Sequence, residues 1–474
     1  MGRSLLLRFK NKYINRPFSR ADKAYYISLI VLSAFFLFKA LEYAFSIEIG
    51  IAPDEPEHFK IIQLYSTYTF RVEEFPEMYV FGPLTHVPYF YYFLMGKILS
   101  LNIFGINDLV FLRLPNIFFS FLTVVFSLKL TALVTKSRLV KLLTVLIITN
   151  VPMFSFLSGM INYDNLADLF AVLSIYSLIY FYKYSTRSSF LFFIIFTSFG
   201  LITKITMFPL AVISTLIILV ILVSRFPKLH ELKNTMGKQI RQISLYEKAL
   251  MIIATFSIML VINLYGRNIM AYRAILPSCY QVTSYDNCQL NPAVRGEEQL
   301  KPPETPIHPY YYFYVWKLHM YDGTFGIFGQ QKLFKKPELI IPYEVIINIS
   351  LLGLAKQISP KKKILLILSI ISAFFILVLA YYQNYSSYLA SSMTFFAVHG
   401  RYLFPVLAPM CILMSYSLMN LFKNHFLKAV IFIMVAIVFL FGDYIYYKRN
   451  VPDEWYRKST IAESFKETNK YYKY

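Results

Sequence analysis

Long apolar runs recur from one end of this chain to the other. A helix of about 20 apolar residues is long enough to cross the hydrocarbon core of a bilayer. Hydrophobic residues make up 57% of the 474 residues, and charged residues make up only 15%. We therefore predict an all-α polytopic membrane protein with about eleven transmembrane helices. The predicted spans are about 24–47, 109–134, 139–157, 164–183, 189–202, 206–224, 248–266, 340–357, 363–382, 402–421 and 427–446.

The basic residues predict how these spans are oriented. The formal net charge is +21, but roughly half of the 47 Lys and Arg residues fall in the amino-terminal segment and in alternate short loops. Short basic loops face the cytoplasm, so this distribution indicates orientation and not a nucleic-acid partner. The segment 83–101 is apolar enough to cross, but its crossing would move every later basic loop outside. We therefore place it on the outer surface.

The predicted organisation has five parts. They are a basic cytoplasmic segment at 1–23, a transmembrane core at 24–225 with an outer loop at 48–108, a basic cytoplasmic loop at 226–247, a second transmembrane region at 248–447 with a large outer loop at 267–339, and an outer tail at 448–474. We expect amphipathic juxtamembrane helices in the first outer loop. The cytoplasmic loops are short and offer little from which to build a site, so we expect the function on the outer face.

A dense cluster of ionisable residues follows the first predicted span. The stretch 53–59, PDEPEHF, holds three carboxylates and one imidazole. Ionisable groups at a membrane are costly and are functional candidates by default. In one interpretation Asp54 and Glu55 are catalytic, one acting as a base while the other orients it or holds a metal. In the other, Asp54 and Glu57 form a capping box at a helix start. The two are compatible, because a cap can also fix a catalytic side chain.

Four further charged residues are predicted on the same outer face. Asp164 lies where the fourth span begins, and Lys204 lies at the turn between two spans. Arg113 and Arg401 each open a span from outside. Cations on an outer face contradict the orienting rule, so we expect them to bind a phosphate or an anionic lipid. The structural alternatives are a helix cap for Asp164 and a snorkelling side chain for Lys204.

The histidines and cysteines add weaker signals. His58 and His86 could hydrogen-bond a phosphate or a metal, although a lone histidine is more often structural. Cys279 and Cys288 lie in the large outer loop, where an oxidising compartment favours a disulfide over two free thiols.

Several nucleotide and protease motifs are missing from the chain. We find no P-loop, dinucleotide glycine pattern, His-Glu-x-x-His motif or nucleophile elbow. A soluble nucleotide cofactor is therefore not expected, and no cofactor is firmly predicted. A divalent metal held by Asp54, Glu55 and His58 is left open. The acidic pair, the outer cations and the aromatic loops indicate an enzyme whose substrate has a lipid tail, a phosphate and a polar head.

The order of these motifs resembles that of the GT-C superfamily of integral-membrane glycosyltransferases, which includes the protein O-mannosyltransferases and the aminoarabinose lipid A transferases. The stretch 53–59 is similar to the family's Asp-Glu motif, with one residue more before the histidine than in the mannosyltransferases. The segment 82–115 looks like its "PPL … FG … RLPS" stretch, and 200–204 like its "GLxxLTK" turn. The segment 152–164 looks like its second outer acidic site. A bacterial branch with PDEPxHF early and GRYxxP late, here 400–405, is most similar.

The resemblance implies a mechanism. The donor would be a polyprenyl-phosphate sugar, and Asp54 would be the general base that deprotonates the acceptor hydroxyl for an inverting attack. Glu55 and His58 would orient it, with or without a metal. Lys204 and Arg401 would hold the donor phosphate, where fixed cations stabilise the charge of the leaving group. The resemblance also implies an integral membrane protein, of the inner membrane in a bacterium, with its site on the periplasmic face.

Two other functions stay open at this point. A flippase or transporter of lipid-linked saccharides would need polar groups along a path through the bilayer, and usually internal repeats. A non-catalytic protein of envelope assembly would use the acidic pair only structurally. The expected partners are a lipid-linked sugar donor, membrane lipids and an acceptor that is a glycan, a lipid or a protein. The sequence specifies neither the sugar nor the acceptor.

Overall fold

The computed structural model of the protein describes residues 19–69, 72–103, 105–225, 244–330, 333–359 and 362–457. Within these ranges, nine helices are long and apolar enough to cross a membrane. The prediction of an all-α polytopic membrane protein is therefore confirmed. Most of the predicted basic segment 1–23, of the loop 226–247 and of the tail 448–474 lies outside the described residues.

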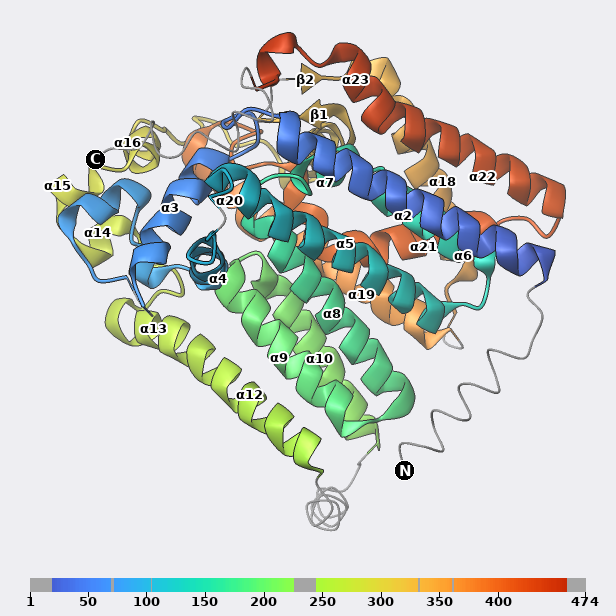
Figure 1. Ribbon diagram of the computed structural model, residues 1–474, viewed down its shortest axis with the longest axis horizontal. Helices are drawn as coiled ribbons and strands as arrows, with labels where there is room; N and C mark the ends of the chain where they lie inside the picture. The colour runs from blue at the N-terminus through green and yellow to red at the C-terminus, as the bar shows by residue number, and fades with distance from the viewer. Residues whose placement is uncertain are drawn as a thin grey trace.

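Figure 1 shows the helices of the first half of the chain in blue to green. They are α2 (Arg20–Ser46), α5 (Asp108–Val134), α6 (Arg138–Thr149), α7 (Pro152–Leu157), α8 (Tyr163–Tyr184), α9 (Arg187–Thr203) and α10 (Met207–Arg225). Helix α8 packs against both α5 and α9. Local polar residues fix where these helices begin. Ser19 and Asp22 form a capping box on α2, and the side chains of Asn107 and Asn162 cap α5 and α8. These contacts satisfy amide groups that a helix start leaves unpaired.

Two of the predicted spans are not among the nine long helices of the described residues. The span predicted at 139–157 is interrupted, because α6 ends at Thr149 and α7 begins at Pro152. Proline lacks an amide proton and disfavours a helical conformation in the residue before it, which explains the break. Helix α9 has 17 residues, at the lower limit for a membrane-spanning helix. The eleven predicted spans therefore correspond to nine long helices and these two shorter elements.

The first predicted outer loop packs as a layer on one end of the bundle. It contains α3 (Glu55–Thr67), η1 (Pro76–Phe81), η2 (Leu84–His86) and α4 (Phe90–Leu99). Helix α4 has 10 residues and would rise only about 15 Å, so it is too short to cross a bilayer. It lies so close to α3 that a Cβ atom at Gly96 would be 2.8 Å from the carbonyl carbon of Tyr65. Residues 83–101 therefore fold beside α3 and form no membrane-spanning helix, and their location on the outer surface stays a prediction.

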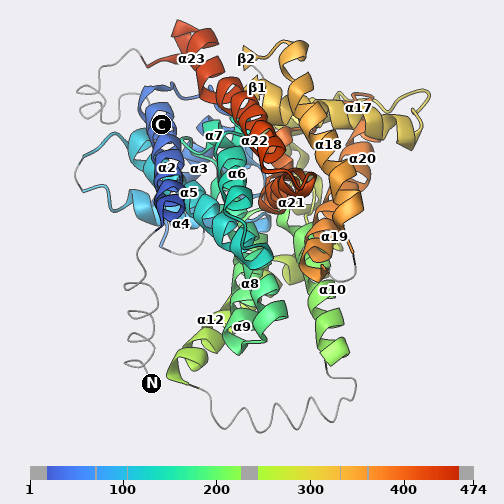
Figure 2. The same ribbon diagram turned by 90° about the vertical axis from the view of Figure 1, so that its right-hand side faces the viewer.

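The second half of the chain completes the bundle. Its long helices are α12 (Leu245–Val261), which continues through η3 (Ile262–Gly266), α18 (Ile341–Gln357), α19 (Lys363–Leu377), which continues through η6 (Val378–Asn384) and α20 (Tyr385–Ser391), then η7 (Gly400–Val406), α21 (Leu407–Asn420) and α22 (His425–Leu440). Helix α21 packs against α6, α18 and α19, and it lies between the two halves in Figure 2. Among the nine long helices, α8 and α21 have the most buried sequences. The bundle is therefore centred on these two helices.

The large loop at 267–339 consists of short elements. They are α13 (Arg267–Tyr272), α14 (Cys279–Val282), α15 (Tyr285–Cys288), α16 (Pro292–Glu298), α17 (Pro309–Tyr321), η4 (Asp322–Gly326), β1 (Ile327–Phe328), β2 (Leu333–Phe334) and η5 (Pro337–Leu339). Strands β1 and β2 pair antiparallel. The structure joins Cys279 and Cys288 in a disulfide whose Cα atoms are 5.7 Å apart. This crosslink connects α14 to α15.

The end of the described chain returns to the first loop. Helix α22 continues through η8 (Phe441–Ile445) and α23 (Tyr446–Asn450), and the separate turn η9 (Asp453–Trp455) follows. The amide of Glu48 then donates to the carbonyl of Trp455 over 2.9 Å, and Ile47 and Tyr456 form an isolated bridge. The residues that follow α23 therefore hold the segment that leads into the predicted catalytic stretch.

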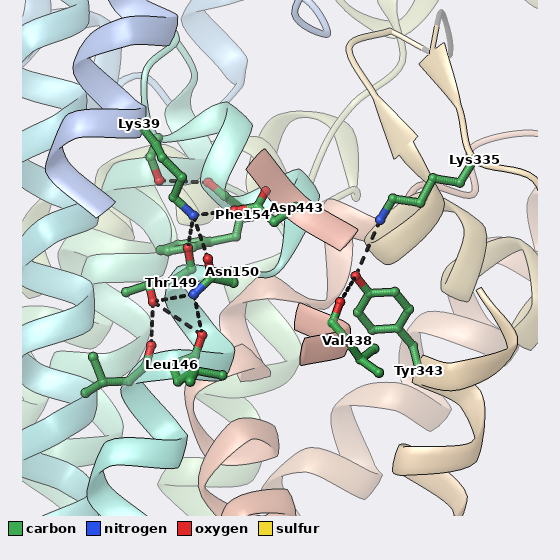
Figure 3. Close-up of polar contacts among 11 residues, drawn as sticks. Lys39, Leu146, Thr149, Asn150, Phe154, Lys335, Tyr343, Val438 and Asp443 are labelled. Carbon is green, nitrogen blue, oxygen red and sulfur yellow. Dashed lines mark hydrogen bonds and ion pairs between the residues drawn. The ribbon is translucent and has the colours of Figure 1, made fainter. Parts of the chain in front are cut away.

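A buried ion pair links the first and last long helices (Figure 3). Lys39 of α2 pairs with Asp443 of η8, and both side chains are fully buried. Lys39 also donates to the carbonyl of Thr149 over 2.7 Å and to Oδ1 of Asn150 over 2.9 Å. It thereby satisfies polar groups at the break between α6 and α7. Charges within a membrane protein interior are tolerated when they are paired in this way.

Candidate active site

Asp54 directly precedes α3 in the chain. In space it lies at the end of the bundle where α2 ends and α5 begins, and we call this the site end. Its backbone is left-handed (φ 58°, ψ 12°), which few residues other than glycine adopt. The side chain makes no hydrogen bond to the start of α3, and Glu57 is exposed. The alternative of a capping box is therefore wrong. The Asp54 carboxylate instead forms an ion pair with Arg401, and its side chain stays 42% exposed.

Glu55, the neighbour of Asp54, has the opposite surroundings. Its two oxygens accept hydrogen bonds of 2.8 and 2.7 Å from Arg113, and the amide of Ile161 donates to it over 2.9 Å. Arg113 also donates to the carbonyls of Ala44 and Ile47, over 3.0 and 2.7 Å. Glu55 and Arg113 are both fully buried. This bidentate pair joins α3 to α5 and to the end of α2.

The structure brings together the residues predicted from distant parts of the chain. Lys204, which follows α9, forms an ion pair with Asp164 in the first turn of α8. Arg401, in η7 before α21, has its Nε atom 3.7 Å from Oδ2 of Asp164. All three side chains are at most 5% exposed. Lys204 is therefore a buried partner of a carboxylate, and the snorkelling alternative is wrong.

Arg401 connects the two carboxylates of the site. One of its nitrogens pairs with Asp54, while Nε and Nη1 are buried without a hydrogen-bond partner among the described residues. Oδ2 of Asp164 is likewise unpartnered in the described part of the chain. Partial burial alone would raise the pKa of Asp54, but the Arg401 guanidinium outweighs it and holds that pKa below the ordinary value. Asp54 is therefore ionised at neutral pH, beside donors that a further anion could occupy.

Two histidines face this charged cluster. The Nδ1 atom of His58 is 2.9 Å from the Tyr92 hydroxyl, and its Nε2 atom is buried with no partner among the described residues. Burial lowers the pKa of His58 to about 3, against the opposing effect of Asp54. Burial and Arg401 likewise lower the pKa of His399 to about 3. Both rings are therefore neutral at neutral pH and can donate or accept a hydrogen bond.

Some residues of this cluster were not singled out from the sequence. His399 directly precedes Gly400 and Arg401, and Asp168 lies one helical turn after Asp164. Asp168 is 3% exposed, and neither of its carboxylate oxygens has a partner within the described ranges. The four-residue spacing of two acids on an apolar helix was a signal that could have found Asp168. For His399 the only signal was its adjacency to Arg401.

Other predicted residues lie outside the cluster or serve it indirectly. His86 makes its hydrogen bonds to Asn268, over 3.0 Å, and to Glu74, over 3.2 Å. These contacts join η2 to α13 and do not involve Asp54. Arg113 is occupied by Glu55 and by backbone carbonyls, so its contacts are those of a structural residue.

The predicted metal ligands do not form a metal site. Among the residues that the structure describes, no group of three or more His, Cys, Asp or Glu side chains could hold a metal ion. Both oxygens of Glu55 are directed at Arg113, and Asp54 is paired with Arg401. The set of Asp54, Glu55 and His58 therefore does not fit a metal, and no step of the reaction is derived through one.

Comparison with known proteins bears on the fold. The structure of ArnT from Cupriavidus metallidurans bound to undecaprenyl phosphate superposes with a TM-score of 0.50 and 11% sequence identity, covering 83% of this chain and 60% of ArnT. The arabinosyltransferase EmbB from Mycobacterium smegmatis gives a TM-score of 0.46 at 9% identity, covering 97% of this chain and 41% of EmbB, which is too weak to carry an argument. No curated protein matches the chain. The fold is that of the GT-C class.

Within that class, one family is indicated by the sequence. Residues 76–269 match the model of the dolichyl-phosphate-mannose-protein mannosyltransferase family. The predicted resemblance to the GT-C superfamily is therefore confirmed by the matched segment and by the fold. The matched segment contains Arg113, Asp164 and Lys204 but neither Asp54 nor Arg401. The chain spans 60% of the length of ArnT.

Proposed function

We propose that this protein is a membrane glycosyltransferase that moves a sugar from a polyprenyl-phosphate donor to an acceptor hydroxyl at the outer face of the membrane. One observation carries the proposal. A partly open carboxylate, Asp54, lies beside a buried arginine, Arg401, two of whose nitrogens make no hydrogen bond to the described residues, although Nε faces Asp164 over 3.7 Å. A base and an unsatisfied cation side by side are what an acceptor hydroxyl and a leaving phosphate require. The ligand of ArnT, undecaprenyl phosphate, supports the donor class.

In the proposed reaction, Asp54 takes the proton of the acceptor hydroxyl. The hydroxyl oxygen attacks the anomeric carbon opposite the phosphate, the bond from that carbon to the phosphate oxygen breaks, and the phosphate leaves with the electron pair. The new glycosidic bond has inverted configuration. Glu55 does not touch the substrate in this scheme. It positions Asp54 by fixing the first turn of α3 to Arg113.

The charges of the site fit this scheme. The donor diester carries one negative charge, and the phosphate product carries nearly two at neutral pH. Asp54 becomes neutral at the same moment, so the total charge around Arg401 stays the same while negative charge moves from the carboxylate to the phosphate. Arg401 is paired with Asp54, and its Nη1 atom, which has no hydrogen-bond partner among the described residues, can donate to a phosphate oxygen. Arg401 can therefore pair first with the Asp54 carboxylate and then with the leaving phosphate, so the negative charge has a cationic partner throughout the reaction.

Lys204 and His58 complete the proposed donor site. Lys204 is held by Asp164 and lies 4.5 Å from the Tyr163 ring centroid and 5.1 Å from that of Tyr402. A phosphate oxygen could share its ammonium group with Asp164. The unpartnered Nε2 atom of His58 offers a neutral hydrogen bond to the sugar or to the phosphate.

The decisive test is replacement of Asp54 with asparagine. Asparagine keeps the shape of the side chain but cannot take a proton, so transfer of radiolabelled sugar should fall about 10²–10⁴-fold. Binding of donor lipid and thermal stability should remain close to wild type. The matched control is Glu57→Gln, an amide substitution at an exposed acid three residues away. An Asp54→Asn protein that transfers sugar at the wild-type rate would refute the proposal.

A further inference from the structure

A pocket lies beside the charged cluster and has no role in the donor scheme. It has a volume of about 200 Å³ and is lined by residues of the large loop and of the segment before η7. Its polar groups are His319, Asp322 and His399, and Phe334 and Phe395 are among its apolar walls. We call it the lateral pocket. None of its lining residues belongs to the segment 76–269 that matches the mannosyltransferase family.

The lateral pocket and the charged cluster share a wall. His399 lines the pocket, and Asp54, Arg401 and Lys204 are the charged groups that act on its ring. The Nδ1 atom of His399 accepts a hydrogen bond of 3.4 Å from the amide of Arg401, which pairs with Asp54, so the pocket adjoins the charged cluster.

Two glycines fix this wall in place. A Cβ atom at Gly400 would lie 2.2 Å from the carbonyl carbon of Gly323, so the backbones of η4 and η7 are in direct contact. Gly323 also lines the lateral pocket, and Gly400 directly precedes Arg401. The pocket and the proposed phosphate-binding arginine therefore form one rigid unit.

The lining of the pocket favours one kind of ligand. Asp322 and the two histidines can accept and donate hydrogen bonds to hydroxyl groups. The rings of Phe334 and Phe395 are 58% and 56% exposed, so their faces are open to a ligand. Among the residues that the structure describes, no lysine or arginine lines the pocket, which disfavours an anionic group. A pocket wall that combines aromatic faces with a carboxylate and imidazoles suits a hydroxyl-rich ring with apolar C–H faces.

We infer that the lateral pocket binds the acceptor, and that the acceptor presents an uncharged saccharide unit there. This inference rests on the proposed function, because it names the acceptor of that transfer. His399 would then lie between the bound saccharide and Asp54, and would position the acceptor hydroxyl for the base. The carboxylate of Asp322 would hold hydroxyl groups on the far side of the ring.

The test compares two reactions of the purified full-length protein. Radiolabelled polyprenyl-phosphate sugar is supplied with neutral oligosaccharides as probes, and both transfer and hydrolysis of the donor are measured. In the Asp322→Asn and Phe395→Ala variants the KM for the oligosaccharide should rise about tenfold or more, since each loses a contact to the ring. Donor hydrolysis should be unchanged in both. Asp286→Asn and Phe422→Ala, exposed residues outside the pocket, should match wild type.

The outcomes separate the two proposals. If wild type consumes no donor with any acceptor, the proposed function fails. If wild type transfers sugar to oligosaccharides but the pocket variants keep the wild-type KM, the lateral pocket is not the acceptor site. If wild type glycosylates a threonine peptide and no oligosaccharide, the saccharide assignment is overturned while the transferase stands. Phe395→Ala keeps the test valid even where Asp322→Asn folds poorly, because Phe395 is largely exposed.

Discussion

Replacing Glu55 with glutamine should lower the stability of the folded protein, although Glu55 does not contact the substrate in the proposed reaction. Glu55 accepts two hydrogen bonds from Arg113 and one from the amide of Ile161. Glutamine has a single acceptor oxygen, and its amide nitrogen would face a guanidinium that also only donates. Arg113 would keep its charge in a fully buried position. Breaking such a buried pair on one side costs about 3–5 kcal/mol in the free energy of unfolding.

The assay is unfolding in detergent micelles, by heating and by titration with a denaturing detergent. Glu57→Gln is the control, because it makes the same change at an exposed position. Adding Arg113→Met to Glu55→Gln should cost little more, since the stranded charge is then gone and the two effects are not additive. A Glu55→Gln protein as stable as wild type but devoid of transfer activity would refute this reasoning and would make Glu55 a catalytic residue.

Three further predictions follow from the buried charges. Replacing Lys204 with methionine should weaken donor binding by about 1.5–3 kcal/mol in a lipid-binding assay, and adding Asp164→Asn should restore stability but not donor affinity. Lys39→Met should lower the free energy of unfolding by about 3–5 kcal/mol, because it strands a fully buried Asp443. The pKa of His58 is about 3 in the folded protein against an ordinary 6.5, so its contribution to stability is complete above pH 6.5 and is lost as the pH falls toward 3. The melting temperature should therefore fall on acidification, less so in His58→Gln than in the exposed control His425→Gln.

The architecture was predictable because apolar length alone indicates membrane helices. The span count also predicted that Asp54, Asp164, Lys204 and Arg401 lie at the same end of the bundle, and the structure shows that they form ion pairs there. Their proximity follows from counting spans and needs no knowledge of side-chain packing. The roles proposed for these residues remain predictions.

The pairing of the charges was not predictable from the sequence. Asp54 and Glu55 are adjacent, yet one pairs with Arg401 and the other with Arg113. The left-handed backbone of Asp54 turns its side chain away from α3, and only the tertiary structure determines that conformation. His86 looked equivalent to His58 in the sequence, but its partner Asn268 is supplied by a helix 182 residues further along. Side-chain partners across such separations have no local signal.

The long-range pairs also constrain how the protein is made. Lys39 and Asp443 are 404 residues apart, and Asp54 and Arg401 are 347 residues apart. During synthesis the first helix enters the membrane with a lysine whose counter-charge does not yet exist, and a lysine at the bilayer centre costs roughly 2.5–3.5 kcal/mol on insertion scales. Helix α2 therefore cannot form its final ion pair until the helix that carries Asp443 is inserted. The proposed active site thus forms only after Arg401 has been synthesised, so a chain released from the ribosome before that residue would lack transfer activity.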